Sequence, residues 1–89
     1  MSKFRAKHIL VEHSYEIDDL LRKIEQGTPF EKLAQDFSQC PSGAQGGDLG
    51  EFSKGMMVKP FEQALEKLKP GEISGPVKTQ FGHHLILRY

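Results

Sequence analysis

Four side chains in this sequence have the types and surroundings to carry chemistry: His8, Cys40, Thr79 and His84. His8 and His84 each lie in an apolar run, and a neutral imidazole offers one hydrogen-bond donor and one acceptor. A histidine pair on neighbouring strands can therefore satisfy one another and orient a third polar group from a flanking loop, either Cys40 or Thr79. The plainer alternative is that both histidines are hydrogen-bonded residues of the core.

Metal binding and nucleophilic hydrolysis are the other chemistries that these residue types suggest. Four histidines and one cysteine are enough ligands for zinc. However, His83 and His84 are neighbours that point to opposite sides of a strand, and no paired C-x-x-C or H-x-x-x-H spacing is present. A Cys–His nucleophile is conceivable, but no oxyanion-hole motif accompanies Cys40. We therefore expect no metal, no cofactor and no hydrolase.

The stretch 40–61, CPSGAQGGDLGEFSKGMMVKPF, contains the single cysteine and five glycines. Ordering glycine is costly in backbone entropy, so this density indicates tight turns or a close approach to the main chain rather than an ordinary surface loop. Met57 and Phe61 at its end, with Phe81, are either core residues or the wall of a shallow apolar pocket. A proline ring would fit such a pocket.

Two strands must hold the histidines, and both have the pattern of central strands. Residues 4–12 and 84–89 carry apolar side chains in both phases, which is typical of strands covered on both faces. Residues 48–52 predict a short strand bulged at Gly50, and residues 72–77, interrupted by Gly75-Pro76, predict an edge strand.

One-sided apolar stripes predict three helices. The first has its stripe over 17–24 and ends at Gly27. The second begins with a capping box of Thr28 and Glu31, with Pro29 as its first helical residue, and fades at residue 38. The third begins with Pro60 as its first helical residue and ends at 69–71.

The predicted fold class is therefore α+β, in the order β-α-α-β-α-β-β. A small, largely antiparallel sheet wrapped by helices satisfies this order. Because the first and last strands both read as central, we expect them to pair in the middle of the sheet. That pairing would bring His8 and His84 together.

Composition limits the class of protein. The 89 residues suit one domain, 1–89, and twelve basic residues balance twelve acidic ones, which argues against nucleic-acid or membrane-surface partners. No apolar run approaches the length of a membrane span, and residues 1–16 lack the apolar region of a signal peptide. A single cysteine suits a reducing compartment. We expect a cytoplasmic monomer.

Several motifs in order make the chain resemble the parvulin peptidyl-prolyl isomerases over nearly its whole length. They are AKHILV (6–11), the C-P-S-G turn at Cys40, GGDLGEF ending at Phe52, GMMVKPF (55–61) and PGEISGPVKTQFGHHLI (70–86). The resemblance implies a four-stranded antiparallel sheet surrounded by helices. It also implies an enzyme that accelerates rotation about X-Pro bonds in unfolded or flexible protein segments and so helps folding. The alternative is a peptide-binding chaperone module with little isomerase activity.

The resemblance also implies roles for eight residues. The hydrogen-bonded catalytic set is His8, Cys40, Thr79 and His84. The set that lines the proline pocket is Leu49, Met57, Phe61 and Phe81. In the phosphoserine-proline-directed branch the loop after the first strand is long and basic, whereas here it is the short link 13–15 between two glutamates. We therefore expect unphosphorylated substrates.

For the mechanism we favour non-covalent stabilisation of the twisted amide. The polar set would determine the polarity beneath the carbonyl group, while the apolar set would grip the proline ring. Attack by Cys40 on the carbonyl is the alternative, but it creates an oxyanion for which the sequence offers no evident pair of donors.

Overall fold

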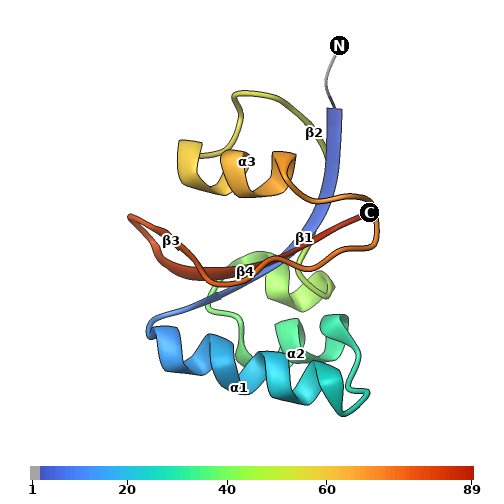
Figure 1. Ribbon diagram of the computed structural model, residues 1–89, viewed down its shortest axis with the longest axis vertical. Coiled ribbons are helices and arrows are strands. Elements are labelled where there is room, and N and C mark those ends of the chain that lie inside the picture. The colour runs from blue at the N-terminus through green and yellow to red at the C-terminus, as the bar shows by residue number, and fades with distance from the viewer. Residues whose placement is uncertain (1–2) are drawn as a thin grey trace.

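The computed structural model describes residues 3–89, and its chain forms one sheet with helices on both sides (Figure 1). Residues 1 and 2 of the predicted domain lie outside this described part. The elements are β1 (Lys3–Val11), α1 (Ser14–Glu25), α2 (Phe30–Phe37), the short 3-10 helix η1 (Pro41–Gln45), β2 (Asp48–Ser53), α3 (Lys59–Glu66), β3 (Val77–Thr79) and β4 (Gly82–Arg88).

The sheet has the strand order β2-β1-β4-β3, and every pairing is antiparallel. The first and last strands therefore pair in the middle, as the apolar runs predicted. The α+β fold class and the element order are confirmed, with η1 as an addition inside the glycine-rich stretch.

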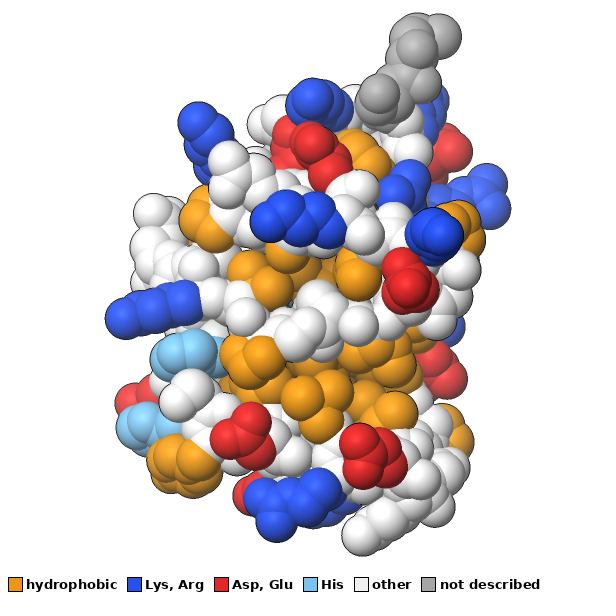
Figure 2. All heavy atoms as spheres, viewed as in Figure 1, with side chains coloured by type: hydrophobic (Ala, Val, Ile, Leu, Met, Phe, Trp, Pro, Cys, Tyr) orange, Lys and Arg blue, Asp and Glu red, His pale blue; other side chains and the backbone are white. Residues whose placement is uncertain are grey.

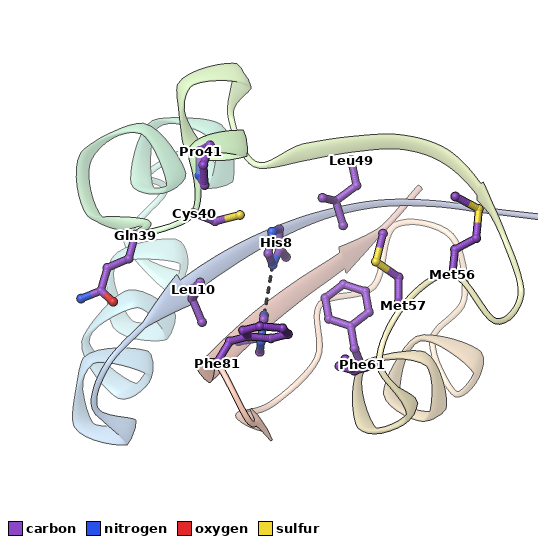
Figure 3. A pocket seen from close by; sticks show the side chains of 12 residues that line it. His8, Leu10, Gln39, Cys40, Pro41, Leu49, Met56, Met57, Phe61 and Phe81 are labelled. Carbon is purple, nitrogen blue, oxygen red and sulfur yellow. Dashed lines mark hydrogen bonds between the residues drawn. The ribbon is translucent and has the colours of Figure 1, made fainter.

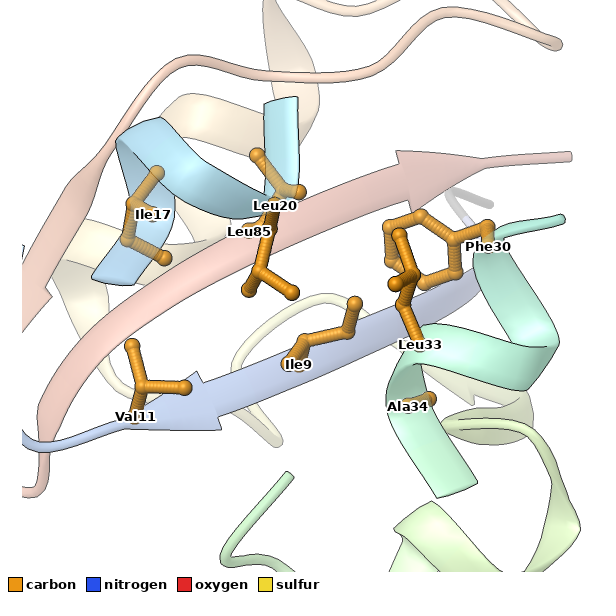
Figure 4. Close-up of a cluster of buried hydrophobic side chains, with 8 residues drawn as sticks. All are labelled: Ile9, Val11, Ile17, Leu20, Phe30, Leu33, Ala34 and Leu85. Atoms are coloured by element: carbon orange, nitrogen blue, oxygen red, sulfur yellow. The ribbon is translucent and has the colours of Figure 1, made fainter. Parts of the chain in front are cut away.

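Alternation along the central strands divides the core into two clusters. Ile9 and Val11 of β1 and Leu85 of β4 pack against α1 and α2, as Figure 4 shows. Phe4, Ala6 and Ile86 point to the other face, towards α3. Because successive side chains of a strand point to opposite faces, a strand apolar in both phases needs cover on both sides, and the two helical layers provide it.

Several predicted boundaries were wrong. The third helix, α3, ends at Glu66 and not at 69–71. The edge strand is Val77–Thr79, because Pro76 has no N–H for a ladder, and the preceding segment makes only an isolated bridge through Ile73. Helix α2 begins at Phe30, because Pro29 is its N-cap and has no side-chain group that could cap it. The carboxylate of Glu31 accepts a hydrogen bond from Lys7 Nζ at 3.1 Å and closes no capping box. Helix α3 begins one residue before Pro60.

One glycine of the stretch 40–61, Gly47, makes the contact between that stretch and β1 possible. The N–H of His8 donates to the carbonyl of Gly47 at 2.9 Å. A Cβ at Gly47, where φ is +81°, would lie 2.3 Å from the carbonyl oxygen of His8. The predicted bulge is confirmed, because two residues, Leu49 and Gly50, lie opposite the single Ala6 in the β1–β2 ladder. Glycine therefore lets the chain pass close behind His8.

Charged side chains of both signs are interspersed on the face that Figure 2 presents, around a band of hydrophobic side chains across its middle. Within residues 3–89, no helix combines the length and the apolar character needed to cross a bilayer.

Candidate functional site

The two central histidines meet through their ring nitrogens. The register of β1 with β4 pairs His8 with Ile86 and Leu10 with His84, so the histidines are diagonal neighbours on one face of the sheet. Their Nδ1 atoms lie 3.1 Å apart, and the rings stack with centroids 5.3 Å apart. Both side chains are buried, with 5% and 4% of their surface exposed. The expected contact between the strands is therefore present.

A hydroxyl group continues this contact at each end. Thr79 Oγ1 lies 2.7 Å from His84 Nε2 and also accepts a hydrogen bond from the N–H of Phe81 at 3.2 Å. Ser42 Oγ lies 3.2 Å from His8 Nε2. The network thus runs from Ser42 through both imidazoles to Thr79.

Cys40 has a different place from the one that the sequence suggested. It is half-buried on the wall of the groove described below, and its sulfur makes no hydrogen bond to the described residues, while its N–H donates to Ser38 Oγ at 3.3 Å. Ser42, which the sequence analysis missed, occupies the position beside His8 instead. The signal was present, because Ser42 belongs to the same C-P-S-G turn.

Both imidazoles are neutral at pH 7. Burial, and then electrostatic repulsion from His84, lowers the pKa of His8 from 6.5 to about 4. Burial, and then the charge of His83, also lowers the pKa of His84. Removal from water disfavours the protonated form of a histidine, which explains the direction of both shifts.

Neutral rings allow the network two arrangements of its protons. A contact between two Nδ1 atoms holds one proton, so one ring donates and the other accepts. If His8 donates, its Nε2 accepts from Ser42 and the Nε2–H of His84 donates to Thr79. If His84 donates, all three bonds reverse. Every imidazole nitrogen is satisfied in either arrangement.

The side chains of the site show no arrangement for a metal ion. Within residues 3–89, no three His, Cys, Asp or Glu side chains gather as a metal-binding group. The four ring nitrogens of His8 and His84 are occupied by one another and by the two hydroxyls.

A groove of about 480 Å³ lies over the histidine pair. Its walls come from β2, the loop after β2, α3, the turn between β3 and β4, and the segment before η1 (Figure 3). The four residues predicted to hold a proline ring all line it: Leu49, Met57, Phe61 and Phe81. So do His8, His84 and Cys40. The lining residues that the sequence analysis did not name are Leu10, Gln39, Pro41, Met56 and Val58.

Phe61 joins the apolar groove to the polar network. Its ring is 3% exposed and meets both imidazoles edge to face, with centroids 5.6 Å from His8 and 5.4 Å from His84. Phe81 and Met56 form the open rim, with 60% and 69% of their surfaces exposed. The groove thus combines a rigid aromatic floor with an accessible apolar rim.

Residues 7–88 match the rotamase family, described as the PPIC-type PPIASE domain. Among curated proteins, the chain is 51% identical over 85 residues to the foldase protein PrsA of Geobacillus kaustophilus, covering 94% of this chain and 30% of that protein. It is 50% identical over 68 residues to the chaperone SurA of Burkholderia pseudomallei, covering 76% of this chain and 15% of that one. The chain thus spans about a third or less of these relatives.

Solved structures agree with this match. The crystal structure of PrsA from Bacillus anthracis superposes with a TM-score of 0.94 at 42% identity, over 97% of this chain and 40% of that one. NmPin, the parvulin of Nitrosopumilus maritimus, superposes with a TM-score of 0.89 at 44% identity, over 100% of this chain and 97% of that one. The sequence match, the shared fold and the histidine pair under an apolar groove together establish that this chain belongs to the PPIC-type peptidyl-prolyl isomerase family, the parvulins.

Proposed function

We propose that this domain accelerates cis/trans rotation about X-Pro bonds in unfolded or flexible protein segments, by non-covalent stabilisation of the twisted amide. The observation that carries the proposal is the apolar groove directly over two neutral, hydrogen-bonded imidazoles. Membership of the peptidyl-prolyl isomerase family supports it independently.

The reaction requires no bond to break. Resonance makes the amide planar, and rotation about it costs about 18–20 kcal/mol. In the twisted state this resonance is lost and the prolyl nitrogen becomes pyramidal. An enzyme that binds the twisted form better than either planar isomer lowers the barrier, and a reduction of about 5–7 kcal/mol gives roughly 10⁴–10⁵-fold acceleration.

The two halves of the site suit the two halves of the substrate. The apolar wall of Met57, Phe61 and Phe81 can grip the pyrrolidine ring, so that rotation occurs on the carbonyl side of the bond. Beneath it, the His8–His84 pair offers dipoles without net charge, which hydrogen bonds hold in either of the two proton arrangements. Fixed dipoles in an apolar surrounding stabilise a changing charge distribution better than water does, because they need no reorganisation.

The groove favours substrates without a phosphate group. None of its lining residues is Lys, Arg, Asp or Glu, and a phosphate would need cationic partners there. We therefore propose segments with unphosphorylated residues before proline as substrates.

The place of Cys40 supports the non-covalent route. A thiol needs a base to become a nucleophile, but both ring nitrogens of His8 already have other partners, Nδ1 in His84 and Nε2 in Ser42. We expect Cys40→Ser to retain the isomerase rate of the parent within about tenfold. A loss of more than about 10³-fold in a folded Cys40→Ser protein would favour covalent attack.

Exchange NMR on a series of Ala-X-Pro-Phe peptides tests the proposal, with catalytic amounts of the protein and a phosphorylated Ser-Pro peptide alongside. Cross-peaks between cis and trans forms should appear for the unmodified peptides. Faster exchange of the phosphorylated peptide would overturn the substrate assignment. Peptide binding without exchange would favour the chaperone-module alternative.

The monomeric state and the cytoplasmic location are proposals of the same kind. The balanced charge of the chain, with twelve basic and twelve acidic residues, supports them only in that it gives no net attraction to an acidic partner or membrane surface. Sedimentation equilibrium tests the first, and fractionation of the source cells tests the second.

A further inference from the structure

Glu62 is a buried carboxylate whose partner is not a cation. It belongs to the first turn of α3 and is 9% exposed. Among residues 3–89 no Lys, Arg or His nitrogen forms an ion pair with it. Its Oε2 accepts a hydrogen bond of 2.6 Å from the N–H of Gly55. A glutamate is rarely buried unless it is paired, so this carboxylate calls for an explanation.

Gly55 lies in the loop that carries the two methionines of the groove. We name this segment, residues 54–57, the methionine loop. Its remaining hydrogen bonds are local, because Met56 and Ser53 bond to one another through the Met56 N–H at 3.2 Å and through Met56 Sδ at 3.4 Å. Gly55 has a φ of +94°, and a Cβ added there would meet no atom within 4 Å. The side to which a Cβ would point is therefore open, and the hydrogen bond to Glu62 is the contact that holds the Gly55 N–H.

Two polar interactions join the methionine loop to α3 in the described part of the chain, beside the packing of Met57 against the core cluster that contains Phe61 and Leu65. One is the ion pair of Lys54 with Glu66 at 3.5 Å, with both side chains largely in water. Exposed ion pairs of this kind contribute little, because solvent screens them. The other is the bond from Gly55 to Glu62, which is charge-assisted and partly buried. It is therefore the stronger of the two polar attachments.

The position of Glu62 in the helix links this attachment to the site. Its neighbour Phe61 points to the two imidazoles and forms the floor of the groove. Glu62 points instead to the loop that forms the facing wall. Adjacent residues of one turn of α3 thus serve both sides of the groove: Phe61 forms the floor, and Glu62 holds the loop that forms the wall.

We infer that Glu62 is a positioning residue: its carboxylate holds the methionine loop over the groove and so determines how tightly the domain binds a proline-containing segment. This inference rests on the proposed function, since it concerns the substrate of the same groove. It assigns Glu62 no contact with the substrate. What matters is the length of the side chain, because the acceptor must reach Gly55.

Three substitutions separate length from charge. Glu62→Asp keeps the charge but withdraws the oxygens by one methylene, Glu62→Gln keeps the length and an acceptor oxygen, and Glu62→Ala removes both. Glu66→Ala, on the same helix, removes the exposed ion pair and is the matched control. The measurements are the Kd for Ala-Leu-Pro-Phe by NMR titration, the exchange protection of the Gly55 amide, and the unfolding free energy in urea.

Glu62→Asp and Glu62→Ala should weaken peptide binding by about tenfold and expose the Gly55 amide to exchange, while Glu62→Gln should stay within about threefold of the parent. Glu66→Ala should match the parent. If Glu62→Ala does not fold, the comparison of Glu62→Asp with the parent tests the inference.

Parent-like peptide binding by a folded Glu62→Asp protein would overturn the inference, and so would a Gly55 amide that stays protected in it. A purely structural role would lower the unfolding free energy and leave the Kd unchanged. If the parent binds the peptide but does not isomerise it, the proposed function fails while these comparisons still test Glu62.

Discussion

Acidification from pH 7 to pH 4 should cost the folded domain about 3 kcal/mol of unfolding free energy through His8 alone. The cause is burial: the side chain is 5% exposed, and its pKa is lowered from 6.5 to about 4. A domain of this size has a total stability of about 5–15 kcal/mol, so the loss would be a large share of it.

The sign follows from proton binding. As the pH falls below 6.5, His8 of the unfolded chain takes up a proton, whereas in the folded domain it stays neutral until about pH 4. The unfolded state therefore binds more protons in this window, and stability falls with falling pH. Each pKa unit corresponds to about 1.36 kcal/mol, which gives the value of about 3 kcal/mol between pH 6.5 and 4. Above pH 6.5 the contribution is fully present.

Urea unfolding followed by circular dichroism at pH 4, 5, 6 and 7 measures the effect, with His8→Asn as the comparison. Asparagine keeps a hydrogen-bonding atom near the Nδ1 position but does not titrate. Protonation of carboxylates also lowers the unfolding free energy at low pH, but it does so in both proteins, so this effect cancels in the difference between them. His13→Asn is the matched control, because the His13 side chain is 51% exposed.

The parent should lose stability more steeply than His8→Asn between pH 6.5 and 4, while His13→Asn should follow the parent. Equal slopes for the parent and His8→Asn would refute the reasoning. An NMR titration in which the His8 ring protonates near pH 6.5 in the folded domain would refute it as well, because burial would then have no effect on that group.

Three further substitutions test the site and its support. Gly47→Ala would place a Cβ 2.3 Å from a backbone oxygen at φ +81° and should lower the unfolding free energy in urea by more than about 3 kcal/mol. The control Gly71→Ala, with φ +93° and open space around the Cβ, should lower it by about 1 kcal/mol. Similar losses in the two proteins would contradict the packing argument. Thr79→Val removes the hydroxyl 2.7 Å from His84 Nε2 and should lower the unfolding free energy by about 1–3 kcal/mol. It should also slow the cis/trans exchange of the peptide in NMR. Parent-like values for both would exclude a role for that bond. Phe81→Ala should change stability by less than about 0.5 kcal/mol, because the ring is 60% exposed, but should raise the peptide Kd severalfold; an unchanged Kd would remove Phe81 from the binding surface.

Local patterns in the sequence determined the elements and the central strands. Apolar side chains in both phases of 4–12 predicted a strand covered on two faces, and Ile9 and Ala6 do pack in opposite clusters. These signals are local, because strand periodicity and turn chemistry act over a few residues. The glycine density of 40–61 likewise predicted a close approach, which the structure places at Gly47.

Tertiary structure decided which polar atoms meet. His8 and His84 are 76 positions apart, and their contact depends on a register that pairs His8 with Ile86. A slip of one residue would turn one imidazole to the opposite face, and no local pattern excludes that slip. The choice of Ser42 over Cys40 beside His8 depends in the same way on the 3-10 turn of η1. Sequence determined the chemical groups available to the site, while the long-range pairing of strands and loops determined their geometry.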